Sequence, residues 1–149
     1  MINNFDGEYA FLSNFYECQV IFDGIVYQSS EAAFQAQKTL DLSERKRIAT
    51  LTPGQSKKAG RKVVLRSDWE SVKTKVMYEI CKAKFMQNPD LKEKLLETGA
   101  EHLEEGNTWG DTFWGTMNGF GKNRLGCILM QIREELRNSS NNNFAKEEN

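Results

Sequence analysis

The spacing of apolar and polar residues predicts a β-hairpin near the start of the chain. Residues 17–27 read ECQVIFDGIVY, so two β-prone runs flank Asp23-Gly24. This pair is favoured in type I′ turns, which join neighbouring antiparallel strands. We therefore expect a small hairpin before the first helix.

Three later segments carry apolar residues at the spacing of an amphipathic helix. They begin after Asp68, at Asn88-Pro89 and near Gly121, and the last one ends at residue 137. Residues 138–149 are rich in asparagine and nearly free of apolar residues, which is typical of a disordered tail. We expect a mainly helical fold with a small N-terminal hairpin, in one domain over residues 1–137.

A further helix is expected at SSEAAFQAQK, residues 29–38, with Ser30 as its N-terminal cap. Glu31, Gln35 and Lys38 then share one side, opposite a face of alanines. Glu31 and Lys38 are two turns apart, which is too far for a simple ion pair. They either converge on a ligand or belong to an ordinary solvated face.

The segment FDGEYAFLSNFY, residues 5–16, concentrates aromatic residues ahead of the hairpin. Such a loop can stack a planar ring on Phe15, with Asn14 beside it. It can equally be an apolar arm that packs on the core. The sequence leaves both interpretations open.

Residues 106–121, GNTWGDTFWGTMNGFG, combine five of the eleven glycines with Trp109 and Trp114. Glycine lets the backbone approach a ligand closely, and the rings would wall a pocket around Asp111. The alternative is a packed connector, but a connector seldom needs so much glycine and tryptophan. We therefore expect a binding loop. The helix after it starts near Lys122 and Arg124, where charge and exposed N–H groups would suit a phosphate.

Residues 54–66, GQSKKAGRKVVLR, carry five cations and no acidic residue. Such a stretch contacts phosphates, including those of DNA, or forms an ordinary solvated surface. The cations are Lys57, Lys58, Arg61, Lys62 and Arg66.

The composition excludes several classes of protein. Twenty basic and twenty-one acidic residues leave a net charge of −1. This balance argues against a protein that coats nucleic acid or a membrane through its overall charge. Cys18, Cys81 and Cys127 are scattered and His102 is the only histidine, which favours neither a disulfide framework nor a metal site. No apolar run suits a signal peptide or a membrane span. We expect a cytoplasmic protein that needs no metal and no cofactor.

Six stretches of the chain, in this order and spacing, resemble the NADAR family from Phe11 to Leu136. They read FLSNFY, SSEAAFQAQK, KKAGR, SDWESVKTKVM, AKFMQNPDLKEKLLETG and DTFWGTMNGFGKNRLGCILMQIRE. The family usually has histidine after the motif glutamate, whereas this chain has Ala32. No role of that histidine therefore carries over.

The resemblance implies a mainly helical fold and an N-glycosidase activity. Family members are linked to ribosylaminopyrimidine phosphates of riboflavin synthesis and to ADP-ribose on guanine bases in nucleic acid. Both substrates hold a ribose through a C1–N bond. The motif positions that the resemblance implies are Asn14, Phe15, Glu31, Lys38, Arg61, Asp111, Trp114, Gly115 and Asn118.

The residue types suit this chemistry. Cleavage of a ribosyl C–N bond builds positive charge at C1, which the carboxylate of Glu31 or Asp111 would stabilise. Desolvation favours the amine form of Lys38, which would attack C1 of an opened ribose; alternatively Lys38 holds a phosphate or hydroxyl as a cation. Phe15 and Trp114 would stack the base, and Asn14 and Asn118 would bond the ribose hydroxyls. Arg61, Lys122 and Arg124 would bind the diphosphate.

Among the activities that the resemblance implies, the basic stretch favours an ADP-ribosyl-guanine glycohydrolase acting on DNA or nucleotides, because its cations would meet phosphates outside the pocket. The alternatives are an N-glycosidase of riboflavin intermediates and a module that binds ADP-ribose or NAD without turnover. We expect Lys38 to be catalytic, with Glu31 and Gln35 beside it, in a pocket formed with residues 109–118.

Overall fold

The structure, a computed structural model, describes the backbone of residues 1–148 and the side chains of residues 1–139. It divides into two compact units. The hairpin unit is Asp6–Pro89, and the loop unit combines Met1–Phe5 with Asp90–Asn149. The expectation of one domain over residues 1–137 stays a prediction.

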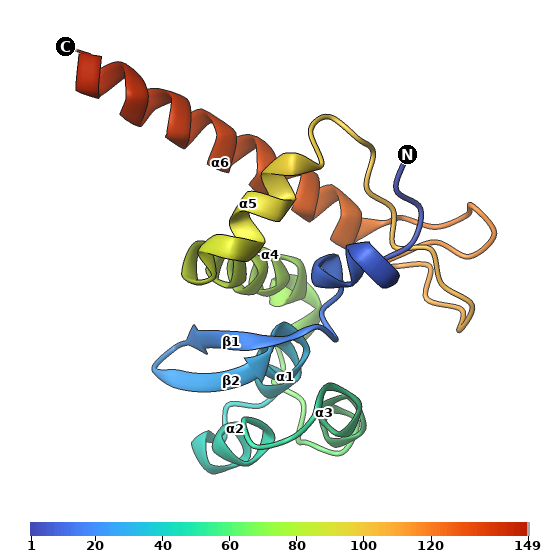
Figure 1. Cartoon of the computed structure of the whole chain (residues 1–149). Coiled ribbons are helices and arrows are strands. Elements are labelled where there is room, and N and C mark those ends of the chain that lie inside the picture. Colours follow the sequence, from blue (N-terminus) through green and yellow to red (C-terminus); the bar gives the residue numbers. More distant parts are fainter. Residues whose placement is uncertain (149) are drawn as a thin grey trace. The chain divides into compact units, whose positions relative to one another are not determined.

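The hairpin unit begins with the 3₁₀ helix η1 (Gly7–Leu12) and the antiparallel strands β1 (Glu17–Phe22) and β2 (Ile25–Ser29) (Figure 1). Asp23 and Gly24 join the strands with φ angles of 50° and 80°. Positive φ at both positions is what a type I′ turn requires, so the predicted hairpin is confirmed.

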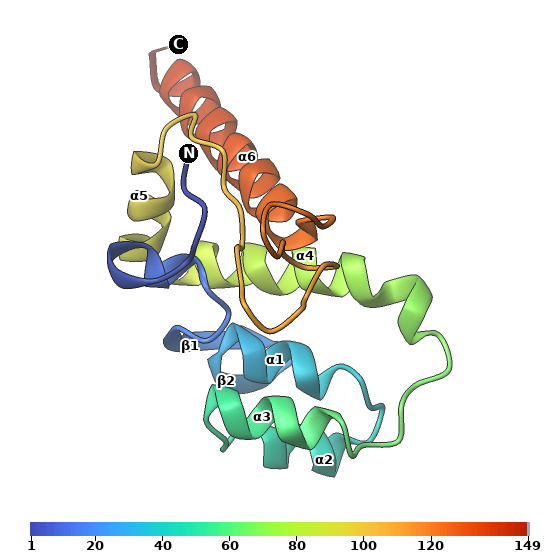
Figure 2. The same cartoon turned by 90° about the vertical axis from the view of Figure 1, so that its right-hand side faces the viewer.

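The rest of the hairpin unit is helical. Its helices are α1 (Ser30–Ala36), α2 (Leu42–Ile48), α3 (Pro53–Gly60) and α4 (Trp69–Gln87). α1 contacts the hairpin and each of the other three helices, so it lies at the centre of the unit (Figure 2). Every residue of α1 is buried for this reason.

Both ends of α1 differ from the sequence-based prediction. Ser29 caps the helix in place of Ser30, because the Ser29 hydroxyl accepts a hydrogen bond from the Ala32 N–H at 3.0 Å. The helix ends at Ala36, and the next three N–H groups bond carbonyls three residues back. Lys38 therefore lies in the turn that follows α1 and not on the helix itself.

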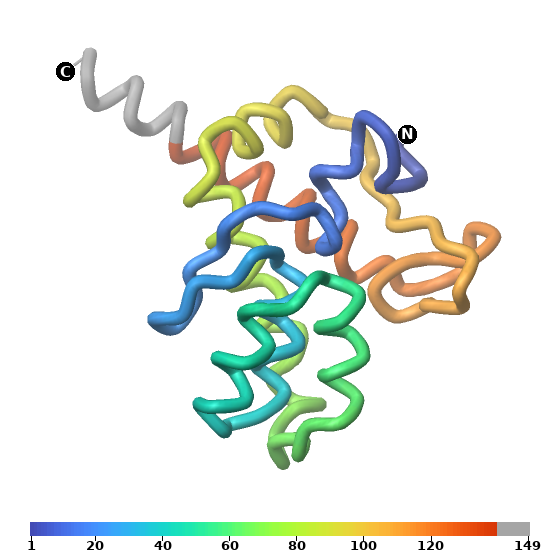
Figure 3. The backbone as a smooth tube through the Cα atoms, turned by 60° about the horizontal axis from the view of Figure 1, so that its bottom comes forward, coloured from blue at the N-terminus to red at the C-terminus, as the bar shows by residue number. Residues whose placement is uncertain are grey.

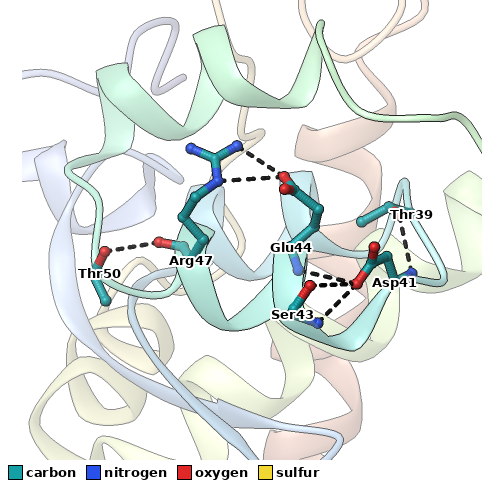
Figure 4. Close-up of polar contacts among 6 residues, drawn as sticks. All are labelled: Thr39, Asp41, Ser43, Glu44, Arg47 and Thr50. Carbon is teal, nitrogen blue, oxygen red and sulfur yellow. Dashed lines mark hydrogen bonds and ion pairs between the residues drawn. The ribbon is translucent and has the colours of Figure 1, made fainter.

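Helices α2 and α3 are additions to the predicted elements, and both are fixed at their first turn. The Asp41 carboxylate accepts from the N–H groups of Ser43 and Glu44 at 2.9 and 3.3 Å (Figure 4). At α3 the Gln55 N–H donates to Thr52 Oγ1, and the Thr52 N–H donates to Gln55 Oε1. Caps of this kind typically stabilise a helix by about 1 kcal/mol.

Helix α4 begins after Asp68 as predicted, but Asp68 does not cap it. Its carboxylate instead accepts from the Arg66 guanidinium at 2.6 and 3.0 Å. Trp69, the first residue of α4, packs against Phe34 of α1 with ring centroids 5.1 Å apart. This contact holds the start of α4 against the centre of the unit.

The loop unit contains α5 (Pro89–Glu97) and α6 (Arg124–Glu148). The helix restarts at Pro89, as predicted. The segment after α5 bonds to the first residues of the chain, since the Ile2 N–H donates to His102 O at 2.9 Å and the Glu104 N–H donates to Ile2 O at 2.8 Å. Residues 106–121 then form a folded-back loop before α6 (amber to orange in Figure 3).

Helix α6 extends past its predicted end. The sequence predicted an end at residue 137 and a disordered tail over residues 138–149, whereas α6 is helical to Glu148. The added segment contains neither proline nor glycine, so its backbone chemistry does not stop the helix. The side chains of residues 140–149 lie outside the described residues, and the order of this tail in solution stays a prediction.

The mainly helical fold with one small hairpin is confirmed for the part of the chain that the structure describes. None of its described helices is long and apolar enough to cross a membrane. The cytoplasmic location stays a prediction.

Candidate active site

Glu31 and Gln35 form a buried pair on α1. Gln35 Nε2 donates to Glu31 Oε1 at 2.8 Å, and the two residues are only 8% and 5% exposed. A solvated helix face would be far more exposed, so that interpretation is wrong for these two residues. The bond fixes the direction of one oxygen of the Glu31 carboxylate.

Gly60 at the end of α3 makes room for this pair. A Cβ atom built on Gly60 would lie 1.9 Å from Gln35 Oε1, so a larger residue would push the Gln35 amide aside. Gln35 Oε1 is itself buried without a hydrogen-bond partner among the described residues. Leaving a buried acceptor unpaired costs free energy, so packing against α3 must hold the amide where it is.

Lys38 is half-buried in the turn after α1. Burial lowers the pKa of its ammonium group, the nearby Glu31 raises it, and the cations Arg61 and Lys57 lower it further. Its Nζ forms no hydrogen bond or ion pair with the residues that the structure describes. A lysine in these surroundings releases its proton more readily than an exposed one, which favours nucleophilic chemistry.

Asn14 joins the aromatic arm to the start of α1. Its backbone carbonyl accepts from the Glu31 N–H at 3.0 Å, and its Oδ1 accepts from Ser30 Oγ at 2.9 Å. Its Nδ2 donates to Met77 Sδ of α4 at 3.3 Å. Both ends of the amide are thus engaged within the unit, so Asn14 positions α1; its contact with ribose hydroxyls stays a prediction.

A buried lysine that the sequence analysis did not single out anchors the same arm. Lys84 on α4 is 1% exposed, and its Nζ donates to Phe11 O at 2.7 Å and to Ser13 O at 3.0 Å. Burial lowers the pKa of this ammonium group. Removing an ammonium group from water is costly, so the two carbonyl contacts must largely replace its hydration.

The aromatic arm combines the two roles that the sequence left open. Phe5 and Phe11 are buried in the core, as a packed arm requires. Phe15 is exposed, and Lys57 Nζ lies 5.9 Å from the centroid of its ring. Phe15 therefore offers a ring face on which a base could stack.

The five cations of the basic stretch differ in their surroundings. Lys58, Arg61 and Lys62 are exposed. Arg66 is half-buried and pairs with Asp68 at 2.6 Å, and Lys57 is half-buried next to Phe15. The exposed three are the ones whose surroundings suit contact with phosphates.

Asp111 shapes the glycine-rich loop. Its Oδ1 accepts from the N–H groups of Phe113 and Trp114 at 3.0 and 2.9 Å. Asn107 holds the backbone of Asp111, since Asn107 Nδ2 donates to Asp111 O at 2.8 Å and the Asp111 N–H donates to Asn107 Oδ1 at 3.1 Å. Side chains that bond nearby backbone groups in this way define turns. The catalytic role of Asp111 stays a prediction.

Gly115 is buried inside the same loop. A Cβ atom built there would lie 2.1 Å from the backbone oxygen of Glu105 and 2.8 Å from Asn107 Nδ2. Glycine is therefore required for the loop to pack against itself. Whether Gly115 also contacts a substrate stays a prediction.

Asn118 lies at the tip of a tight turn. Asn118 and Gly119 have φ angles of 54° and 82°, and the Met117 N–H donates to Phe120 O at 2.9 Å. Asn-Gly is a favoured pair for such turns, so the sequence carried the signal for this one. Asn118 is exposed there, and its contact with ribose stays a prediction.

Lys122 and Arg124 gather around one aromatic ring. Lys122 Nζ and Arg124 Cζ lie 5.5 and 5.8 Å from the centroid of Phe113, which packs edge-on against Trp114. Both cations are exposed, as is Trp109. Their charges could meet an anion in solution.

The N–H groups at the start of α6 are not available to a phosphate, contrary to the expectation from the sequence. The N–H groups of Lys122, Arg124 and Leu125 donate to loop carbonyls at 2.8, 3.1 and 2.9 Å. The loop folds back over the helix start, so its own carbonyls take the position that an anion would occupy.

The structure brings together most of the predicted residues within each unit. In the hairpin unit Glu31 bonds Gln35, and Lys38 lies within electrostatic reach of Glu31 and Arg61. In the loop unit Asp111 bonds the backbone of Trp114. A pocket made by both groups stays a prediction.

Gly60, Lys84 and Asn107 are the functional candidates that the sequence analysis missed. Lys84 takes a position in the buried stripe of α4 beside Cys81 and Phe85, and that was the available signal. Gly60 acts through its contact with Gln35, 25 residues earlier, which the sequence does not indicate. Asn107 bonds the backbone of Asp111 only four residues away, inside an irregular loop where helical spacing gives no signal.

No group of three or more histidine, cysteine, aspartate or glutamate residues in the described part of the chain could hold a metal ion. His102 is exposed and lies 3.4 Å from Glu104. The expectation that turnover needs neither metal nor cofactor stays a prediction.

The chain belongs to the NADAR domain family, whose model matches residues 2–137. It is 42% identical over 133 residues to the N-glycosidase YbiA of Shigella boydii serotype 4 (strain Sb227), covering 87% of this chain and 82% of that protein. It is 38% identical over 135 residues to the riboflavin biosynthesis protein VVA0006 of Vibrio vulnificus (strain YJ016), covering 88% of this chain and 36% of that protein.

The fold is similar to the NMR structure of the Escherichia coli protein YbiA. The TM-score is 0.81 at 37% sequence identity, over 94% of this chain and 89% of that one. The family predicted from the sequence motifs is thus confirmed, and the relatives' names support an N-glycosidase class of activity within it.

Proposed function

We propose that the protein is an N-glycosidase that hydrolyses the bond between C1 of a ribose and a nitrogen atom. The observation that carries the proposal is the half-buried Lys38 beside Glu31, with a lowered pKa and with Nζ making no hydrogen bond or ion pair to the described residues. The name of the YbiA relative supports the same class of reaction.

In the proposed reaction Lys38 attacks C1 as the neutral amine. The C1–N bond to the base breaks and the leaving nitrogen takes up a proton, which leaves C1 bonded to Nζ of Lys38. The ring bond from C1 to O4 then breaks, O4 takes up a proton, and a Schiff base links C1 of the opened ribose to Lys38. Water then adds to C1, the bond from C1 to Nζ breaks, and the sugar and the lysine amine are released. The carboxylate of Glu31, oriented by Gln35, stabilises the positive charge at C1 and carries the protons.

As the substrate we propose ADP-ribose attached to guanine, in DNA or in nucleotides. The exposed cations Lys58, Arg61 and Lys62 support this choice, because nucleic acid supplies phosphates beyond the ribose that is cleaved. The exposed ring of Phe15 supports stacking of a base.

One observation favours a second candidate. The Vibrio vulnificus relative is named a riboflavin biosynthesis protein, which favours ribosylaminopyrimidine phosphates as the substrate. The same attack on C1 would serve that substrate, because it carries the same ribosyl C1–N bond.

A direct comparison of substrates tests the proposal. The protein is incubated with an ADP-ribosylated guanine oligonucleotide and, separately, with ribosylaminopyrimidine phosphates, and the released base is measured by chromatography. We expect turnover of the oligonucleotide. Turnover of the pyrimidine phosphates alone would make them the substrate in place of ADP-ribosylated guanine. If neither substrate is cleaved, ADP-ribose still binds, and Glu31→Gln binds it equally well, the protein is a binding module without turnover.

A further inference from the structure

The loop of residues 61–66, referred to as the 61–66 loop, exposes apolar side chains among cations. Val64 is 87% exposed and Leu65 is 52% exposed, and Arg61 and Lys62 are exposed next to them. None of these four side chains contributes to the core of the hairpin unit. Adjoining exposed apolar residues with a charged rim indicate a surface that meets a partner.

One end of the 61–66 loop is bonded to Lys38, and the other end lies near it. At one end the Arg66 N–H donates to Lys38 O at 2.8 Å. At the other end Arg61 lies close enough to Lys38 to act on its charge. A partner bound to this loop would therefore lie next to the proposed nucleophile.

We propose that the 61–66 loop and the neighbouring Lys58 form a DNA-docking surface. Lys58, Arg61 and Lys62 bind backbone phosphates, and Val64 and Leu65 insert against the bases next to the modified guanine. This inference rests on the proposed function, since it supplies the means by which a modified base in DNA is brought to Lys38.

Charge supports DNA as the partner. The chain has a net charge of −1, yet residues 54–66 hold five cations and no acidic residue. Asp68 pairs with Arg66, so the exposed cations of the stretch are Lys58, Arg61 and Lys62, which all precede the apolar pair in the sequence. A phosphate ester of a small sugar would use one or two of these cations and would give Val64 and Leu65 nothing to contact.

The apolar pair suits bases because many DNA-binding proteins insert leucine, isoleucine or similar side chains between base steps. Such a wedge opens the stack, and enzymes that act on a base must expose it from the stack. Flanking cations hold the backbone in place while the wedge is inserted. The 61–66 loop offers both kinds of side chain within a few residues.

Binding of unmodified DNA tests the surface without reference to turnover. Fluorescence anisotropy is measured with a labelled duplex and with the matching single strand, over a series of salt concentrations. Three phosphate contacts predict a slope of log K against log salt of about −3 for the duplex and about −2 for the single strand. Absence of salt-dependent binding to either probe would overturn the proposal.

Two double variants separate the apolar and the charged parts. Val64→Ser with Leu65→Ser should raise the dissociation constant about tenfold, because the wedge loses its apolar burial, and should leave the salt slope unchanged. Lys58→Gln with Lys62→Gln should reduce the salt slope by about 2. An unchanged dissociation constant in the serine variant would overturn the wedge.

A matched control comes from the hairpin, where Ile21 and Val26 are 44% and 45% exposed. Ile21→Ser with Val26→Ser should bind DNA as the wild type does. Equal weakening in this control and in the Val64→Ser with Leu65→Ser variant would show a general loss of apolar surface and overturn the proposal. Thermal melts of all variants confirm that the fold is retained.

Turnover separates this inference from the proposed function. The Val64→Ser with Leu65→Ser variant should cleave free ADP-ribosylated guanosine at the wild-type rate and the modified duplex several-fold more slowly. If the wild type cleaves neither substrate, ADP-ribosylated guanine is rejected as the substrate. The anisotropy measurements still decide whether the protein binds DNA. Tighter binding to phosphatidylserine vesicles than to DNA would assign the surface to a membrane and overturn the proposal.

Discussion

The surroundings of α1 and the glycine-rich loop both concentrate predicted site residues, yet they are held in opposite ways. Around α1 two bonds between predicted site residues and their neighbours join side chain to side chain, from Gln35 to Glu31 and from Ser30 to Asn14. In residues 106–121 the bonds of Asp111 serve the backbone. A change near α1 should therefore affect turnover first, whereas a change in the loop should affect stability first.

The largest effect is expected at Lys38. Lys38→Ala and Lys38→Arg should both fold and bind ADP-ribose but lose turnover by at least about a hundredfold, because neither supplies a nucleophilic amine. Single-turnover kinetics and thermal melts measure the two properties. Borohydride added during wild-type turnover should attach the sugar to Lys38, as peptide mass spectrometry would show.

The arginine variant sharpens this test. Near-full activity in Lys38→Arg would rule out the covalent route and leave Lys38 as a charge that holds the substrate. Near-full activity in Lys38→Ala would remove the turn after α1 from the catalytic site altogether.

A pair of glycines compares the two regions directly. Gly115→Ala places a methyl group against the backbone of Glu105 and should lower the free energy of unfolding by about 1–3 kcal/mol. Gly60→Ala meets only the Gln35 side chain, mainly its amide end but also Cβ at 3.2 Å, and alanine favours helix by about 0.5–1 kcal/mol over glycine. Its stability should change little, while kcat falls roughly ten- to a hundredfold as Glu31 loses its orientation.

Urea unfolding and steady-state kinetics on both glycine variants decide the comparison. Equal losses of stability in Gly60→Ala and Gly115→Ala would contradict the difference between the two regions, because both would then respond in the same way. Full activity in a folded Gly60→Ala variant would show that the bond from Gln35 does not orient Glu31.

Much of the fold follows from the sequence, and the reasons for the exceptions are local. The Asp23-Gly24 turn and the apolar stripe of α6 have strong signals and are found. α2 has a charged sequence without apolar periodicity, so only its Asp41 cap could have revealed it. α3 does carry a helix signal in its sequence, the capping box of Thr52 and Gln55 with Pro53 between them.

In the candidate site, residue spacing predicts some contacts and misses others. Helical spacing correctly grouped Glu31 with Gln35, because these residues are neighbours on one helix. Spacing cannot show that the Asp111 carboxylate bonds its own loop, or that Lys84 reaches the carbonyl of Phe11 across the fold. Contacts such as the one from Lys84 to Phe11 depend on how the segments pack, and the spacing of residues in a single sequence does not reveal that packing.

Asp111 gives a smaller effect. Asp111→Ala removes the acceptor of two loop N–H groups and should lower the free energy of unfolding by about 1 kcal/mol, as loss of a capping side chain does. Asp111→Asn keeps a carbonyl oxygen at that position and should melt as the wild type does. A large fall in kcat for Asp111→Asn at unchanged melting temperature would support the catalytic role predicted from the sequence.

The smallest effect is a dependence of stability on pH. Burial lowers the pKa of Lys38 and Lys84, so the native state binds fewer protons than the unfolded chain between those lowered values and 10.5. The free energy of unfolding should therefore rise with pH in that range. Tyr27, whose pKa burial raises from 10.0, acts in the opposite direction above pH 10.

Urea midpoints between about pH 8 and pH 10 measure this rise. Lys38→Ala should show a smaller rise than the wild type because one of the two lysines is removed. A midpoint that falls over this interval in the wild type would contradict the direction of both pKa changes.

The backbone bonds of Ile2 impose an order on folding during translation. Ile2 pairs with His102 and Glu104, so these two backbone bonds form only after ~100 residues beyond Ile2 have been translated, a delay of ~5–20 s at the usual rates of synthesis. Asp6–Pro89 contains its own buried residues and can collapse during that interval. A nascent chain stalled before residue 102 would therefore leave the N–H and C=O groups of Ile2 without these two backbone partners.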